Sequence, residues 1–198
     1  VVYRKPATAG MESAPIVVLQ GHMDMVHQKN ADTDFDFDTQ GIQSRVDGEW
    51  VRANGTTLGA DNGIGVAAAM AILTSTDIPH PALEVLITVD EETGMTGANK
   101  LSPDMLKGRI MFNLDTEDEN ELCIGCAGGI DTLGTLAYTQ ENAPADAQGV
   151  KITVKGLKGG HSGMDIILGR ANANKVLNRM LWGAGSAFGL RLSVFDGG

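Results

Sequence analysis

A histidine and several acidic residues of this sequence have the types and spacing that metal-dependent chemistry requires. His22 and Asp24 stand just beyond residues 16–20, a short and mostly apolar run that predicts a buried strand ending in a loop. A histidine there can bind a metal ion while a nearby aspartate fixes its ring by a hydrogen bond. Alone, the His-x-Asp triplet does not define a site; its significance comes from the acidic residues that follow.

Asp61 is the next such residue, and it lies in a Gly-rich turn. The turn leads into residues 66–73, which are Ala-rich and apolar nearly all round and therefore predict a buried helix. Two interpretations of Asp61 stay open at this point. It could cap the N-terminus of the helix, or it could be a metal ligand.

Two further acidic clusters close strongly apolar runs. Glu91 and Glu92 follow residues 83–89, and Asp115 follows residues 109–114; both runs predict strands. Neighbouring carboxylates repel one another unless a positive charge lies among them. This repulsion favours a functional interpretation of the glutamate pair.

One histidine and several carboxylates suit zinc, manganese or cobalt, with zinc as the first choice. Two divalent ions about 3.5–4 Å apart can share a carboxylate and activate a water molecule. A carboxylate that is not a ligand can then take a proton from the water and pass it to a leaving amine. Glu91 and Glu92 could divide these roles. The sequence contains no nucleophilic-serine elbow, phosphate loop or dinucleotide fingerprint.

The elements that must position these residues follow a strand–helix–strand rhythm over residues 16–114. This rhythm predicts an α/β fold with a mixed, mainly parallel sheet, in which ligands gather outside the carboxyl ends of the strands. We also expect a hairpin over residues 43–53 and a short helix over residues 96–101. Residues 121–126 predict a strand in which both cysteines are buried as thiols.

The pattern changes near residue 128. Residues 130–139 and 150–154 alternate like strands, residues 164–181 are helical in pattern, and residues 186–195 predict a further strand. This order predicts the start of an α+β domain. We therefore expect two domains, 1–127 and 128–198.

Composition excludes several classes of partner. The net charge of −10 argues against nucleic acid and anionic membranes. The sequence has neither an apolar stretch long enough for a membrane span nor the apolar core of a signal peptide. Two cysteines are too few for a disulfide framework, which suits a cytoplasmic protein. The chain starts without Met and ends in an apolar run, which predicts a fragment of a longer protein.

Five motifs, in this order, resemble those of the M20 metallopeptidases, and among them the bacterial dipeptidases. The similarity runs along essentially the whole chain. The motifs are His22-Met23-Asp24-Met25-Val26, Gly59-Ala60-Asp61-Asn62-Gly63, Asp90-Glu91-Glu92-Thr93-Gly94, Asn113-Leu114-Asp115-Thr116-Glu117 and Gly160-His161-Ser162-Gly163.

The resemblance implies a zinc-peptidase-like catalytic domain with a dinuclear site, followed by a lid domain. One metal ion would be held by His22, Asp61 and Asp115. The second would be held by Asp61 as the bridge, by Glu92 and by one further histidine. The family takes that histidine from a segment that follows the lid, and the four histidines of this chain do not include it.

The resemblance also implies the remaining roles. Asp24 would orient His22, Glu91 would be the general base, and His161 would stabilise the oxyanion, reaching a partner subunit's site in a homodimer. The implied activity is hydrolysis of dipeptides, either Xaa-His such as carnosine or a broad set. An M20 aminoacylase, deacylase or aminopeptidase is the alternative within the fold, and a non-catalytic binding protein is the alternative outside it. With one metal ligand missing, we expect the isolated chain to be weakly active or inactive.

Overall fold

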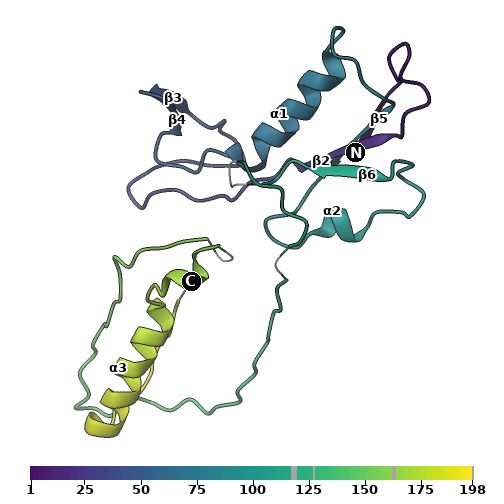
Figure 1. Cartoon of the computed structure of the whole chain (residues 1–198). Coiled ribbons are helices and arrows are strands. Elements are labelled where there is room, and N and C mark those ends of the chain that lie inside the picture. Colours follow the sequence, from purple (N-terminus) through teal and green to yellow (C-terminus); the bar gives the residue numbers. More distant parts are fainter. Residues whose placement is uncertain (117–119, 127, 162–163, 198) are drawn as a thin grey trace. The chain divides into compact units, whose positions relative to one another are not determined.

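The computed structural model describes residues 1–116, 120–126, 128–161 and 164–197. The chain clusters into two compact units, Val1–Cys123 and Ile124–Gly198 (Figure 1). Whether these units correspond to a catalytic domain, 1–127, and a lid domain, 128–198, stays a prediction.

The first unit is built on a four-stranded sheet in the order β1-β5-β2-β6. β2 is parallel to both of its neighbours, β5 and β6, whereas β1 is antiparallel to β5. The predicted α/β fold with a mixed, mainly parallel sheet is therefore confirmed. The strands are β1 (Val2–Lys5), β2 (Val17–His22), β5 (Leu83–Thr88) and β6 (Ile110–Asn113).

Helix α1 (Ala60–Thr74) packs against this sheet (Figure 1). Its buried Ala69 contacts a core formed by Leu19, Val85 and Ile87 of the two central strands. The small alanine side chain lets the helix approach the sheet closely, which explains why an Ala-rich segment was needed here. The far end of α1 is tied to β1, because Lys5 Nζ donates hydrogen bonds to the carbonyl oxygens of Ile72 and Ser75 at 2.9 and 2.6 Å.

Two of the three smaller expected elements, the hairpin and the short helix, are also present. The hairpin consists of β3 (Ser44–Asp47) and β4 (Trp50–Ala53), and Gly48 in its turn has the positive φ of 64° that favours glycine. The short helix is α2 (Thr96–Asn99). Both elements were predictable because their signals are local in the sequence.

The predicted strand over residues 121–126 is wrong. The described residues there form no strand, and Cys123 and Cys126 are exposed rather than buried. A strand requires a neighbouring strand that accepts and donates its backbone hydrogen bonds, and this segment belongs to neither of the two sheets in the described residues.

In the second unit the structure contains a 3₁₀ helix, η1 (Met164–Leu168), and helix α3 (Ala173–Phe188). The single long helix expected over 164–181 is thus interrupted, at Gly169, whose φ is 64°. Asn172 caps α3 by accepting a hydrogen bond from the backbone N–H of Lys175, and Gly189 ends the helix in the left-handed conformation.

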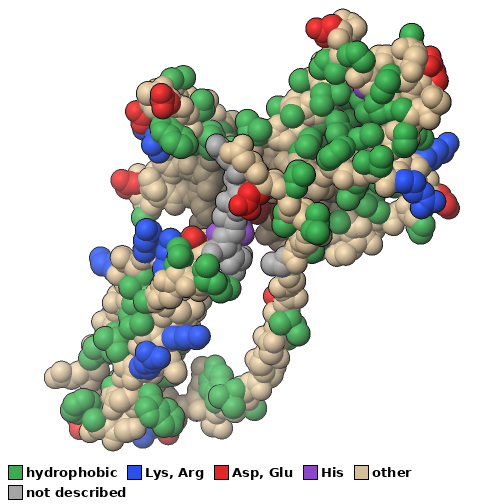
Figure 2. All heavy atoms as spheres, viewed as in Figure 1, with side chains coloured by type: hydrophobic (Ala, Val, Ile, Leu, Met, Phe, Trp, Pro, Cys, Tyr) green, Lys and Arg blue, Asp and Glu red, His purple; other side chains and the backbone are tan. Residues whose placement is uncertain are grey.

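The three strands expected in the second unit, 130–139, 150–154 and 186–195, are absent from its described residues. Residues 186–188 belong to α3 instead. The alternating apolar side chains of the first two runs, among them Ile130, Leu133 and Val150, are exposed. Apolar side chains lie on the surface of both units (Figure 2). An alternating pattern becomes a strand only when another strand and a covering layer are available, and the described residues of this unit supply neither.

Within the described part of the chain, no helix combines the length and the apolar character that crossing a bilayer requires.

Candidate metal centre

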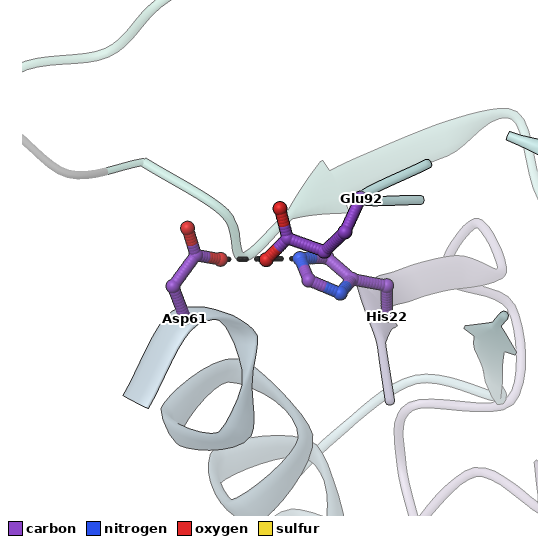
Figure 3. Close-up of side chains that lie close together, drawn as sticks. All are labelled: His22, Asp61 and Glu92. Carbon is purple, nitrogen blue, oxygen red and sulfur yellow. Dashed lines mark hydrogen bonds and ion pairs between the residues drawn. The ribbon is translucent and has the colours of Figure 1, made fainter. Parts of the chain in front are cut away.

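The candidate site lies at the carboxyl ends of the two central strands and of β6. His22 is the last residue of β2, Glu92 follows β5, and Asp115 follows β6. Asp61 comes from the first turn of α1. Figure 3 shows Asp61 and Glu92 with their carboxylates near the His22 ring. The fold therefore brings together residues that are up to 93 positions apart because parallel strands end at the same edge of a sheet.

His22 is the buried centre of the site, with only 1% of its surface exposed. Its Nδ1 lies 2.9 Å from the backbone carbonyl oxygen of Asp24. Its Nε2 lies 3.1 Å from Asp61 Oδ1 and 3.6 Å from Asp115 Oδ1. A carbonyl oxygen can only accept a hydrogen bond, so Nδ1 carries the hydrogen. In the neutral ring, the lone pair of Nε2 then faces the two carboxylates.

This arrangement requires a proton or a metal ion between Nε2 and the carboxylates. An imidazole lone pair that faces carboxylate oxygens is repelled by them unless a proton or a metal ion lies between. Burial alone would lower the pKa of His22, but the nearby Asp115 and Asp61 carboxylates outweigh burial and raise it. The ring is thus placed to share a cation with its acidic neighbours.

The carboxylates of the site also repel one another. Burial, followed by a hydrogen bond and repulsion from Asp61, raises the pKa of Asp115 to about 6. Burial and repulsion from Asp61 also raise the pKa of Glu92. One atom from each of His22, Asp61 and Glu92 lies within 4.8 Å of the other two. One imidazole nitrogen and several carboxylate oxygens form a donor set that fits zinc, manganese or cobalt.

Asp61 does not cap the helix. The cap of α1 is Gly59, without a side-chain hydrogen bond, and Asp61 has non-helical backbone angles, φ −85° and ψ 114°. Its peptide bond to Asn62 is cis. Of the two interpretations left open by the sequence, the geometry favours the metal ligand, because the carboxylate turns toward His22 rather than toward the backbone N–H groups of α1.

Asp24 makes a contact that the sequence did not indicate. Its Oδ2 accepts a hydrogen bond from the backbone N–H of Glu92 at 3.1 Å. Burial would raise the pKa of Asp24, but the backbone N–H groups of Glu92 and Glu91 outweigh burial and lower it. The contact with the His22 ring is made chiefly by the backbone carbonyl of Asp24, while its Oδ1 lies 3.5 Å from Nδ1. Asp24 thereby joins the end of β2 to the loop that carries the two glutamates.

The remaining predicted residues have different placements. Glu91 is half-buried, and its charge contributes to the raised pKa of both Asp115 and Glu92. His161 belongs to the second unit and is exposed, with its backbone N–H donating to Asp165 Oδ2 at 3.0 Å. The roles of Glu91 as base and of His161 at the oxyanion stay predictions. The other motif residues Glu117, Ser162 and Gly163 lie outside the described residues.

A cavity of about 490 Å³ adjoins the site. Its volume is within the range of about 300–1,000 Å³ that is usual for small-molecule pockets. A larger hollow of about 660 Å³ lies at residues 103–109, which precede β6 and so lie at the opposite end of that strand from Asp115. The smaller cavity is the one next to the candidate metal ligands. It is lined by Asp24, Met25, Val26, His27, Gln28, Asp90, Glu92 and Thr93.

Comparison with known proteins gives a consistent result. Residues 18–163 match the model of peptidase family M20/M25/M40. The whole chain is 53% identical to the cytosol non-specific dipeptidase of Escherichia coli strain K12 and covers 41% of that protein. Among solved structures, it is similar to the aminoacylhistidine dipeptidase of Vibrio alginolyticus, with 50% identity and a TM-score of 0.64. That match covers 97% of this chain and 39% of the Vibrio chain. The chain thus spans about two fifths of the length of these relatives.

Proposed function

Because the chain belongs to peptidase family M20/M25/M40, we propose that the protein hydrolyses dipeptides at this centre with the help of divalent metal ions. The observation that carries the proposal is the convergence of the His22 ring with the Asp61, Glu92 and Asp115 carboxylates. The relatives in E. coli and Vibrio, a non-specific dipeptidase and an aminoacylhistidine dipeptidase, indicate the substrate class. We propose dipeptides as substrates, either broadly or of the Xaa-His type such as carnosine.

Two divalent ions, with zinc as the first choice ahead of manganese or cobalt, suit the oxygen-rich donor set. His22, Asp61 and Asp115 would hold one ion, and Asp61 and Glu92 would hold the other. When bound, such ions polarise the scissile carbonyl and lower the pKa of the attacking water. Asp61 and Glu92 alone give the second ion fewer protein ligands than the three that are usual in catalytic zinc sites. We therefore expect the 198-residue chain by itself to be weakly active or inactive.

The proton transfers would be carried out by Glu91. Its carboxylate takes a proton as the water oxygen bonds to the carbonyl carbon of the peptide. The same proton then goes to the amide nitrogen as the carbon–nitrogen bond breaks, so that the amine leaves neutral. Asp24 supports both halves of the site, because it bonds the His22 ring through its carbonyl and the Glu92 N–H through its carboxylate.

The second unit would contribute His161, as a hydrogen-bond donor to the oxyanion in a homodimer of the intact protein. The cytoplasmic location predicted from the sequence is supported by the name of the E. coli relative, a cytosol dipeptidase. An M20-type aminoacylase, deacylase or aminopeptidase would use the same metal ligands. No contact in the described residues favours these alternatives over a dipeptidase.

Metal retention is the first test. After dialysis against metal-free buffer, we expect the purified chain to keep about one zinc ion, because three protein ligands and a water complete one site. Asp115→Ala should lose that ion. Asp77→Ala removes an exposed aspartate on the loop after α1 and should keep it. A chain that retains no zinc, or an Asp115→Ala variant that retains it as well as Asp77→Ala does, would overturn the proposed metal site.

Glu91→Gln tests the chemistry separately from metal binding. The variant should keep its metal ion while any turnover of carnosine and of mixed dipeptides falls about 10²–10⁴-fold, the usual contribution of a general base. Turnover that is indifferent to Glu91→Gln would exclude Glu91 as the base. Robust turnover by the unaltered chain would contradict the expectation of weak activity, while leaving the metal site itself intact.

A further inference from the structure

We propose that Asn62 is a positioning residue that sets the separation of His22, Asp61 and Asp115. The inference rests on the proposed metal site and names the side chain that holds its parts in place. Asn62 is 4% exposed and lies where β2, the start of α1 and the end of β6 meet. Its side chain lies against Gly21 and Leu114, and each of these is the chain neighbour of an expected ligand.

Two hydrogen bonds connect β2, β6 and Asn62 beyond the end of the sheet. The backbone N–H of Leu114 donates to the carbonyl oxygen of Gln20 at 2.8 Å, which joins the end of β6 to β2. The carbonyl oxygen of Leu114 then accepts from Asn62 Nδ2 at 2.7 Å. Asn62 directly follows Asp61 and Leu114 directly precedes Asp115, so this hydrogen bond connects the backbone next to two expected ligands.

Two glycines leave space for the Asn62 amide. A Cβ atom at position 21 would collide with Asn62 Oδ1. At position 65, a Cβ would lie 2.6 Å from Asn62 Oδ1 and 2.6 Å from the Leu114 oxygen. Both distances are shorter than real Cβ contacts, so glycine at 21 and 65 is what allows the amide to reach Leu114. Position 21 also precedes His22 directly, so the same amide touches the chain beside all three ligands.

An asparagine at position 62 has an energetic cost. Asn62 Oδ1 is buried and has no hydrogen-bond partner among the described residues. A buried amide oxygen without a partner is unfavourable, and a leucine of similar shape would avoid that cost. Packing alone therefore does not account for Asn62. What asparagine provides, and leucine cannot, is the Nδ2 donor to Leu114.

The test compares two substitutions on the same helix. Asn62→Leu removes the donor and keeps the volume. Leu73→Ala, near the other end of α1, removes core packing far along the helix from the site. Co²⁺ binding to the full chain is followed by its visible absorption, whose intensity reports coordination geometry, and the Tm of each variant is measured in EDTA. We expect Asn62→Leu to weaken Co²⁺ binding at least about tenfold, as loss of a residue that orients ligands usually does, and to alter the spectrum. Leu73→Ala should lower the Tm but leave the Co²⁺ affinity and the absorption spectrum unchanged.

A glycine pair provides an independent arm, which also serves if Asn62→Leu does not fold. Gly65→Ala places a methyl group against both the Asn62 amide oxygen and the Leu114 carbonyl oxygen, so it disturbs the hydrogen bond between the two residues and should weaken Co²⁺ binding. Gly63→Ala, on the same turn, brings its new methyl group within 4 Å of nothing beyond its chain neighbours and the backbone of its own helix, and it should not weaken Co²⁺ binding. Co²⁺ affinities of Asn62→Leu and Gly65→Ala that equal those of their controls would refute the inference alone. An unaltered chain that binds no Co²⁺ would refute the metal site and the inference together.

Discussion

Glu84 is a buried carboxylate far from the metal centre, and its replacement gives a quantitative test of how the first unit is held together. Its side chain, in β5, is 3% exposed. Oε2 accepts hydrogen bonds from the backbone N–H groups of Lys107 and Gly108 at 2.7 and 2.9 Å, and Oε1 accepts from Arg4 Nε at 3.0 Å. Glu84 thus joins β1, β5 and the segment that leads into β6. We consider Glu84→Gln, which keeps the volume and removes the charge.

The expected loss follows from these three bonds. A hydrogen bond to a charged group contributes about 1.5–3 kcal/mol and a neutral one about 0.5–1.5 kcal/mol. The glutamine oxygen can still accept from both backbone N–H groups, so about 1 kcal/mol is lost at each. Arg4 is 54% exposed, so solvent screens its ion pair and the pair adds only about 0.2–1 kcal/mol. Glu84→Gln should therefore lower the free energy of unfolding by about 2–3 kcal/mol at pH 7.

The loss should also depend on pH in a defined direction. Burial would raise the pKa of Glu84, but the N–H groups of Gly108 and Lys107 and the Arg4 guanidinium outweigh it, so the folded-state pKa lies below the ordinary value. A carboxyl group with a depressed pKa stabilises the fold fully above its unfolded-state pKa, about 4.3 for Glu. That stabilisation is lost as the pH falls through the lower, folded-state pKa. The difference between the two proteins should therefore be constant from pH 7 to about 5 and should shrink below about 4.

Urea unfolding of the chain and of Glu84→Gln, followed by circular dichroism between pH 3 and pH 7, measures this difference. Glu49→Gln, at an exposed position in the β3–β4 turn, is the matched control and should change the free energy of unfolding by less than about 0.5 kcal/mol. A Glu84→Gln effect below 0.5 kcal/mol at pH 7, or an effect that does not change down to pH 3, would show that the buried bonds do not act as reasoned.

Two further substitutions test the site and the core. Asp24→Ala removes the acceptor of the Glu92 N–H. It should weaken zinc binding about 10–100-fold in a chelator competition, as loss of groups that orient ligands usually does. An unchanged zinc affinity would mean that the loop with Glu91 and Glu92 holds its position without Asp24. Val85→Ala removes two methyl groups from the centre of the core and should destabilise the chain by about 2–3 kcal/mol in urea. Val46→Ala, on the exposed hairpin, should have an effect within about 0.5 kcal/mol, and equal effects of the two valines would contradict the core described here.

Residues 16–114 show how much of the fold the sequence determined by itself. The strands, hairpin and helices of this part were predictable because their signals are local: apolar runs, a turn with glycine and an Ala-rich stretch. The types of the expected metal ligands were readable for the same reason, as were the positions of His22, Glu92 and Asp115 at or just beyond strand ends. Even so, α1 begins at Ala60, six residues before the predicted segment. Asp61 in its first turn has non-helical backbone angles, and its Oδ1 lies 3.1 Å from His22 Nε2.

The second half of the chain shows where local patterns fail. The alternation at residues 130–139 and 150–154 is the same signal that correctly predicted the β3–β4 hairpin. The hairpin brings its own partner strand across a two-residue turn, whereas these runs depend on pairing with residues distant in the sequence. Their described residues have no such pairing. Exposure of Cys123 and Cys126 has the same cause, because burial of a side chain requires something to cover it.

The contacts that only the tertiary structure decided join residues far apart in the chain. Asp24 and Glu92 are 68 positions apart, Asn62 and Leu114 are 52 apart, and Arg4 and Glu84 are 80 apart. No periodicity or spacing encodes such pairs, since they arise only when the strand order is set: it places Arg4 opposite Glu84 on neighbouring strands and brings the other two pairs together at the carboxyl ends of the strands. The sequence therefore determined which residues are able to bind a metal ion, by their chemistry and their place at strand ends or, for Asp61, at the start of a helix. The folded sheet decided which of them meet, and which other side chains hold them there.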